Sequence, residues 1–196
     1  MKENRNNIFI WLVNPFRFWG GSKLLTAGIL VLLLHIPVGY FFGARFDGAI
    51  DMHISFDVSL LQVTTDVIIA WLSMALSFFV VAKLLNAPAR FIDVAGATAV
   101  ARIPLLLSVF PGYLFVPNAA TVEEILALEG SDLYLLVAGS VILMVFVIWF
   151  FIVLFNAFKI NTNLKRWKLA TGFLLGVIVA EIVSLLLIRQ VLEGIL

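Results

Sequence analysis

The sequence predicts an all-α polytopic integral membrane protein, a bundle of five transmembrane helices with short interfacial helices. Three observations lead to this fold class: the composition, the apolar stretches and the distribution of positive charge. The 196 residues are 63% hydrophobic and 13% charged, with a mean hydropathy of +1.11. A soluble domain is about 45–50% apolar and about 25% charged, so one soluble core cannot bury this excess. The length fits a single membrane domain, residues 1–196.

Five apolar stretches are long enough to cross a bilayer, which requires about 20 residues in a helix. Pro37 should kink the first of them, and Pro104 and Pro111 should kink or break the third towards its outer end. The fourth is long enough to tilt. We expect the spans at approximately 24–44, 60–86, 92–116, 133–158 and 169–189.

The segment before the first span is not a cleavable signal peptide, because its apolar run, residues 8–13, is short and no cleavage site follows. Phe16, Phe18 and Trp19 then alternate with Arg17 and Lys23. This mixture indicates an amphipathic segment lying in the headgroup region, or else an irregular anchor.

Two connections carry local signals of their own. Apolar and polar residues alternate strictly from Ile50 to Val58, which is typical of a half-buried strand. A lone strand has no partner, so we expect an extended stretch on the membrane surface. Between the third and fourth spans, residues 121–124 match a capping box and Gly130 can end the helix that it starts, which predicts a short interfacial helix at residues 122–129.

The orientation follows from the distribution of lysine and arginine among the connections. In the connections and the span ends next to them, the side with the N-terminus carries Lys2, Arg5, Arg17, Lys23, Lys83, Arg90, Lys159, Lys165, Arg166 and Lys168, and the opposite side carries only Arg45 and Arg189. We therefore expect the N-terminus in the cytoplasm and the C-terminus outside. Most acidic residues fall on the outer side and make it negative.

Arg102 lies within the third span, where an arginine costs about 2.5–3.5 kcal/mol on insertion scales and normally faces a partner inside the bundle. Glu181, in the fifth span, is the carboxylate at comparable depth. We predict that the two meet. His35 of the first span either completes a polar network with them or is a buried histidine that is only hydrogen-bonded. Three roles stay open for this network: a structural ion pair, a site for a headgroup or anion, or part of a transport path.

Small residues recur on several spans at helical spacing, which lets neighbouring helices approach closely. The clearest stripe is on the fifth span, and a shorter one is on the third. The alternatives are packing within the chain, which we favour, and a homodimer face. The residues concerned are Gly172, Gly176, Ala180 and Ser184 on the fifth span, Ala97 and Ala101 on the third, and Gly39 with Gly43 on the first.

We predict no cofactor, no metal and no catalytic residues. The chain has no cysteine, which excludes thiolate metal sites and thiol nucleophiles, and it contains no nucleophile elbow, phosphate loop or zinc-protease motif. The outer loop does hold Asp47, Asp51, His53 and Asp57, but their spacing matches no defined metal motif, so a solvated acidic loop is favoured. A net charge of +1 argues against nucleic acid as a partner.

Three short segments resemble the Yip family, the Ypt/Rab-interacting membrane proteins, in its bacterial branch. They are residues 14–18 (Asn-Pro-Phe-Arg-Phe), 44–48 (Ala-Arg-Phe-Asp-Gly) and 98–106, which contain Arg102-Ile-Pro104. Eukaryotic members act in vesicle trafficking as non-enzymatic partners of Rab GTPases. This sequence lacks their long cytoplasmic N-terminal region and its Asp-Leu-Tyr-Gly-Pro motif. Rab binding is therefore not carried over, and the resemblance implies the fold and a non-enzymatic role.

The functional expectation is a non-enzymatic protein of the bacterial inner membrane that organises lipids or other membrane components. Its expected partners are membrane lipids, with other membrane proteins or further copies of the chain as additional possibilities. The alternative is a small transporter or channel that uses Arg102 and Glu181 in the bundle core, which the kinked third span and His35 motivate.

Overall fold

The computed structural model describes residues 8–55, 57–115 and 125–193. Five helical segments are long and apolar enough to cross a membrane, which confirms the predicted all-α bundle. They are formed by α2, α3, α4 with α5, α7, and α8. The elements are α1 (Ile8–Val13), η1 (Pro15–Arg17, a 3-10 turn), α2 (Gly21–Phe42), β1 (Ala44–Arg45), β2 (His53–Ile54), α3 (Leu60–Leu84), α4 (Phe91–Ala101), α5 (Ile103–Phe115), α7 (Gly130–Thr162) and α8 (Arg166–Glu193).

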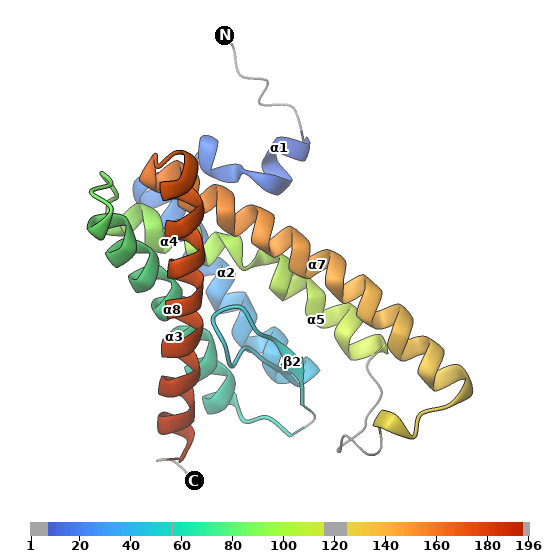
Figure 1. Ribbon diagram of the computed structural model, residues 1–196. Helices are drawn as coiled ribbons and strands as arrows, with labels where there is room; N and C mark the ends of the chain where they lie inside the picture. Colours follow the sequence, from blue (N-terminus) through green and yellow to red (C-terminus); the bar gives the residue numbers. More distant parts are fainter. Residues whose placement is uncertain (1–7, 56, 116–124, 194–196) are drawn as a thin grey trace.

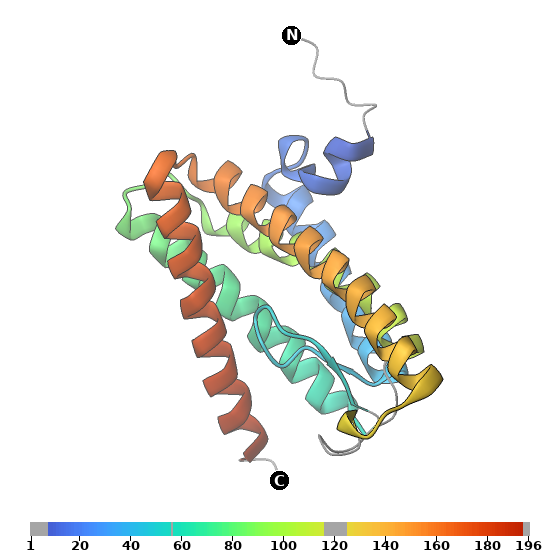
Figure 2. The same cartoon turned by 45° about the vertical axis from the view of Figure 1, so that its right-hand side comes forward.

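The helices pack in pairs that come together at one end and separate towards the other (Figures 1 and 2). Helix α8 packs along α3, α2 along α4, and α7 along α5. The pair α3/α8 lies on one side of the molecule and the pair α5/α7 on the other. The strands β1 and β2 lie between these two pairs, and this position makes them central to the candidate site.

The third span is broken at Arg102, where α4 ends and α5 begins. Our expectation of a break towards the outer end of the span was therefore wrong in position. The reason is that Pro104 has no backbone N–H and disfavours helical geometry in the residues before it, whereas α5 continues through Pro111. Helix α2 likewise continues through Pro37.

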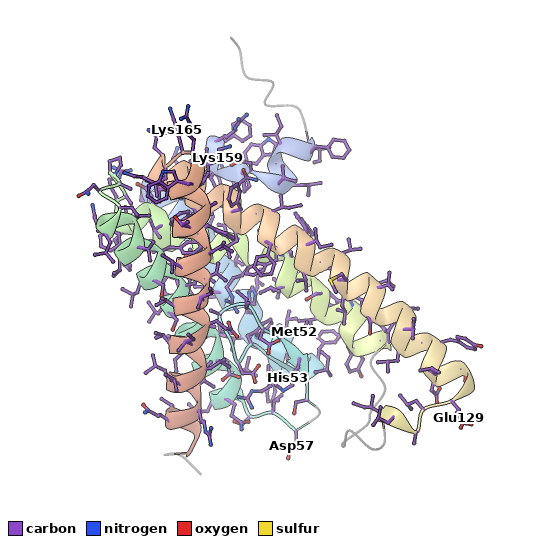
Figure 3. The ribbon with its side chains drawn as sticks, viewed as in Figure 1. Met52, His53, Asp57, Glu129, Lys159 and Lys165 are labelled. Atoms are coloured by element: carbon purple, nitrogen blue, oxygen red, sulfur yellow. The ribbon has the colours of Figure 1, made fainter. Side chains whose placement is uncertain are left out.

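The two ends of the bundle differ in charge (Figure 3). At one end α1 lies beside the C-terminus of α7 and the start of α8, where Lys159 and Lys165 are found; we call this the basic end. The opposite end carries Asp57 and Glu129, and we call it the acidic end. The acidic end is also the end at which α8 finishes.

The segment before the first span forms α1 and η1, which are fixed to α7 at the basic end. The indole Nε1 of Trp149 donates to the carbonyl of Leu12 at 2.8 Å, and Asn156 Nδ2 donates to the carbonyl of Val13 at 3.1 Å. Ile8 and Phe9 of α1 are exposed although they are apolar. Exposed apolar residues on a short helix at the end of a bundle suit the interfacial position that the sequence predicts.

The small-residue stripe of α8 faces α3 within the same chain. A Cβ atom at Gly176 would lie 2.5 Å from Phe78 Cδ1, and one at Gly172 would lie 2.7 Å from Leu85 Cδ1. Ala180 and Ser184 continue the stripe and are fully buried. The two helices therefore approach so closely that only small residues fit between them.

The other predicted packing residues lie at the centre of the bundle, because Ala97 and Ala101 of α4 are fully buried. The predicted interfacial helix at 122–129 begins outside the described residues, as does the capping box at 121–124. Gly130 was expected to end that helix. It is instead the first residue of α7, with a φ of +60° that favours glycine.

Candidate functional site

The connection between α2 and α3 is a re-entrant hairpin, not a stretch on the membrane surface. Strands β1 and β2 pair antiparallel, with Ala44 opposite Ile54 and Arg45 opposite His53. We refer to residues 44–54 as the hairpin. Our expectation that the alternating stretch has no partner was wrong, because Ala44 and Arg45, which follow the C-cap Gly43 of α2, supply one. The alternation itself is real: Ile50, Met52 and Ile54 pack on the core, whereas Asp51 and His53 are exposed.

The base of the hairpin is fixed to α3 by a buried ion pair. Arg45 Nε lies 2.5 Å from Asp66 Oδ2, and Arg45 Nη2 lies 3.1 Å from Asp66 Oδ1. The Asp66 side chain is 0% exposed and that of Arg45 is 14% exposed. A two-point contact between a guanidinium and a carboxylate fixes direction as well as distance, so it sets the angle at which the hairpin enters the bundle.

The two charged side chains at the tip of the hairpin bind a single peptide group. Arg102 Nη1 donates to the carbonyl oxygen of Ala49 at 3.0 Å, and the backbone N–H of Ile50 donates to Glu181 Oε2 at 3.0 Å. These two backbone groups belong to the same peptide bond. Its negative end therefore faces the guanidinium and its positive end faces the carboxylate, so that both charges stabilise the peptide dipole.

Arg102 and Glu181 therefore share a binding partner instead of pairing directly. The predicted contact between them is not formed, because the hairpin tip lies between their two helices. Arg102 lies about 16 Å along the helix from Phe91 at a rise of about 1.5 Å per residue, which is about half the thickness of a hydrocarbon core. The hairpin thus brings backbone polar groups to the middle of the bundle, where the two charged side chains satisfy them.

Ser184 and Gly48 complete this arrangement on the α8 side. The N–H of Ala49 donates to Ser184 Oγ at 2.9 Å, and that hydroxyl donates to the carbonyl of Glu181 at 2.9 Å. A Cβ atom at Gly48 would lie 2.6 Å from Glu181 Oε1. Gly48 is therefore required by the close approach of the carboxylate to the hairpin backbone. Ser184 has a hydrogen-bonding role that its place in the packing stripe did not predict.

His35 joins this group through Phe46 and through Arg102, which both lie next to its ring. Its Nδ1 donates to the carbonyl of Val31 at 2.8 Å, and its ring lies 4.8 Å from the ring of Phe46. The guanidinium of Arg102 lies 5.9 Å from the centre of the same Phe46 ring. Phe46 is fully buried, and its ring contacts both the histidine and the arginine.

Several buried polar atoms in this region have no hydrogen-bond partner among the described residues. They are Nε and Nη2 of Arg102 and Nε2 of His35. Arg102 is 2% exposed and His35 is 0% exposed. Buried polar atoms without partners carry a desolvation cost of about 1–3 kcal/mol each, so they lower the stability of this part of the bundle.

At the acidic end the two strands are joined by a more exposed pair. His53 Nδ1 lies 3.0 Å from Asp47 Oδ1, and both side chains are partly exposed. Burial raises the pKa of the Asp47 carboxyl, but the hydrogen bond and charge of His53 outweigh it and hold that pKa below its ordinary value. The same hydrogen bond raises the pKa of His53.

The four candidate hard ligands of this loop do not form a metal centre in the described part of the chain, which holds no group of three or more histidine, aspartate or glutamate side chains suited to a metal. Asp47 is engaged by His53. The carboxylate of Asp51 accepts from the N–H of Met52, its own neighbour.

The arrangement as a whole is suited to holding a polypeptide backbone inside a membrane. Its charged groups bind peptide N–H and C=O groups, and its small and aromatic residues fill the space around them. No protein-family model matches the sequence, and no curated protein or solved structure is significantly similar to it.

Proposed function

We propose that this chain is a non-enzymatic integral membrane protein of the Yip type that organises lipids or other membrane components. The observation that carries the proposal is the use of the buried charges: Arg102 and Glu181 both bind the backbone of the chain's own hairpin. Buried charges in a membrane protein usually mark a substrate path or a structural lock. The hydrogen bonds at the hairpin tip favour the lock.

The resemblance to the Yip family is consistent with this proposal. Two of its three segments, residues 44–48 and 98–106, contact each other in the structure, because the Arg102 guanidinium lies 5.9 Å from the centre of the Phe46 ring. Residues far apart in the sequence that meet at one structural feature form a unit. In this proposal the unit builds the scaffold, and the apolar outer faces of the helices contact lipids and membrane partners.

The test of this function is a flux measurement with the purified protein in liposomes. We expect no flux of protons, chloride or phosphate above that of empty liposomes, and no turnover of a substrate. Mild-detergent purification should recover defined lipids or membrane proteins with the chain. Catalytic turnover by the reconstituted protein would overturn the proposal.

A small transporter or channel is the second candidate. The unpartnered Nε and Nη2 of Arg102 favour it, because these donors would be available to an anion if the hairpin moved. In that case liposomes should show an anion flux that the Arg102→Ala variant loses. Absence of flux in the wild type excludes this candidate.

We also propose that the basic end faces the cytoplasm of a bacterial inner membrane, because lysine and arginine are concentrated there. Lys165 and Asp57 are exposed at opposite ends, and the chain has no native cysteine. In intact cells an impermeant thiol reagent should label Asp57→Cys and leave Lys165→Cys unlabelled until the cells are opened. The reverse pattern would invert the orientation.

A further inference from the structure

A small apolar cavity lies at the basic end between α1, α5 and α7. Its volume is about 190 Å³. Trp11, Leu12 and Pro15 cover it from the α1 side, and Trp149 and Val153 of α7 form a second wall. The wall opposite is made by residues on either side of the break in the third span, Val100, Ile103, Pro104 and Leu107.

This cavity follows from two features of the fold. The break at Arg102 changes the course of the third span beside α7, and α1 is held over the gap by the hydrogen bond from Trp149 Nε1 to Leu12. Leu12 is 45% exposed and Leu107 is 38% exposed, so the lining continues onto the outer surface of the bundle. In a five-span membrane protein that surface faces lipid.

The lining determines what can occupy the cavity. Its side chains are aliphatic or aromatic, and the indole N–H of Trp149 is already bonded to a backbone carbonyl. An apolar cavity of roughly 150 Å³ stays dry and accepts apolar ligands, because water needs two or more polar partners. At this position in a bilayer the abundant apolar molecule is the acyl chain of a phospholipid.

A positive charge at the basic end fits the same occupant. Lys159 is exposed on α7, six residues beyond Val153, which is about 9 Å further along the helix and about a third of a turn around it. A lysine at the headgroup level attracts lipid phosphate and worsens the fit for a wholly apolar partner such as another helix face. The apolar lining therefore suits the acyl chain of a lipid, and the lysine at the headgroup level suits the phosphate of the same lipid.

The geometry points to a specific lipid site: the cavity holds one acyl chain of a phospholipid from the leaflet at the basic end, with its phosphate near Lys159. This inference deepens the proposed function, on which it rests for the membrane role, by naming phospholipid as a bound component. It does not depend on the hairpin, because the residues that line the cavity make none of the hydrogen bonds to the hairpin.

Native mass spectrometry of the full chain tests the site. The protein is reconstituted in vesicles of phosphatidylcholine and phosphatidylglycerol, then extracted with increasing detergent. We expect the wild type to keep one phospholipid after the others are removed. Val153→Phe places a phenyl ring in the cavity and should lower the lipid-bound fraction by about tenfold. Val145→Phe, the same change at an exposed position of the same helix, should keep the lipid.

A second matched pair covers the possibility that Val153→Phe fails to fold. Leu107→Trp narrows the opening at an exposed position, and Leu114→Trp makes the same change further along α5, away from the cavity. Only the first should lose the lipid. A wild type without a retained phospholipid, or a folded cavity variant that retains it fully, overturns the inference. Loss of the lipid in the control variants as well overturns it too.

The headgroup is tested by comparing the two lipids and the Lys159→Gln variant. Retention of the phospholipid should be weaker in Lys159→Gln than in the wild type. Equal retention would contradict the part of the inference that places the phosphate near Lys159. The flux measurement stays independent: an anion flux with a retained lipid contradicts only the proposed function, and a lost site without flux contradicts only this inference.

Discussion

Two arginines hold the hairpin in place, Arg45 within it and Arg102 beside it, and the structure neutralises them differently. Arg45 at the base has a carboxylate partner in a two-point ion pair with Asp66. Arg102 at the tip donates to a single backbone carbonyl, and its nearest balancing charge, Glu181, is bound to the other end of the same peptide group. The base therefore resembles a conventional buried ion pair. At the tip, one peptide dipole separates the two charges.

This difference between base and tip shows how a re-entrant segment is tolerated inside a membrane. Irregular backbone is allowed there only where protein satisfies its polar groups. The ion pair at the base fixes the direction of the chain, and the charges at the tip satisfy the backbone. We expect the base to contribute more to stability, because its charges compensate each other directly.

The largest effect should come from breaking the ion pair at the base. Asp66→Leu leaves the Arg45 guanidinium without its partner, which costs about 3–5 kcal/mol and should lower the melting temperature in detergent by about 6–20 °C. Adding Arg45→Leu should recover part of this loss. As a control, Arg90→Leu removes an ion pair to Asp93 whose arginine is exposed, and should change the midpoint little. Equal losses of melting temperature in Asp66→Leu and Arg90→Leu would contradict the comparison.

At the tip the two partners should differ in their effect. Glu181→Leu leaves both the Ile50 N–H and the Arg102 charge uncompensated, at about 2–3 kcal/mol, whereas Arg102→Leu removes an incompletely bonded cation and costs about 1 kcal/mol. The double variant should lose less than the sum, because both side chains hold one peptide group. Thermal unfolding in detergent measures all three. Strictly additive losses would show that the peptide does not couple the two side chains.

A smaller loss of stability is expected when the close approach of the hairpin to Glu181 is disturbed. Gly48→Ala introduces a Cβ atom 2.6 Å from Glu181 Oε1, which should displace the carboxylate and cost about 1–2 kcal/mol. Adding Glu181→Ala makes room for the new methyl group, so the double variant should be less destabilised than the sum. The control is Gly20→Ala, whose Cβ would meet nothing closer than 3.7 Å. Equal losses at the two glycines would contradict this close approach.

The helices were predictable from the sequence because the bilayer imposes their length and composition. The expected spans at 24–44, 60–86 and 92–116 correspond to α2, α3 and α4 with α5, whereas α7 and α8 extend three or four residues beyond the expected spans at each end. The break at Arg102 was placed too far out, because proline content alone does not show which proline interrupts a helix. Arg102 was correctly expected to be buried, since its cost in a span requires a protein environment.

The hairpin was not predictable, for two physical reasons. Its first strand, Ala44–Arg45, has only two residues and therefore shows no periodicity. The partners of Arg102 and Glu181 are backbone atoms, which every residue has, so side-chain chemistry could not identify them. The contact between Arg45 and Asp66 was not predicted, because Asp66 lies near the outer end of the second span, where acidic residues are expected. Its place six residues inside the expected span at 60–86 was the available signal.

The smallest effect concerns the exposed pair across the strands and depends on pH. The pKa of His53 is raised above its ordinary value of 6.5, so its stabilising contribution is complete below that pH and is lost as the pH rises through the raised value. The pKa of Asp47 is lowered below 3.8, so its contribution is present above that pH and is lost in stronger acid. The pair should therefore stabilise the hairpin most between about pH 4 and 6.5.

Comparing the melting temperature of the wild type with that of His53→Gln across pH 4–9 measures this contribution. The difference between the two proteins should shrink at alkaline pH, and it should be smaller throughout than the loss in Asp66→Leu, because exposed pairs are screened by solvent. A difference that grows with pH would mean that His53 acts as a neutral group, and that the tie between the strands at the acidic end is not a charge pair.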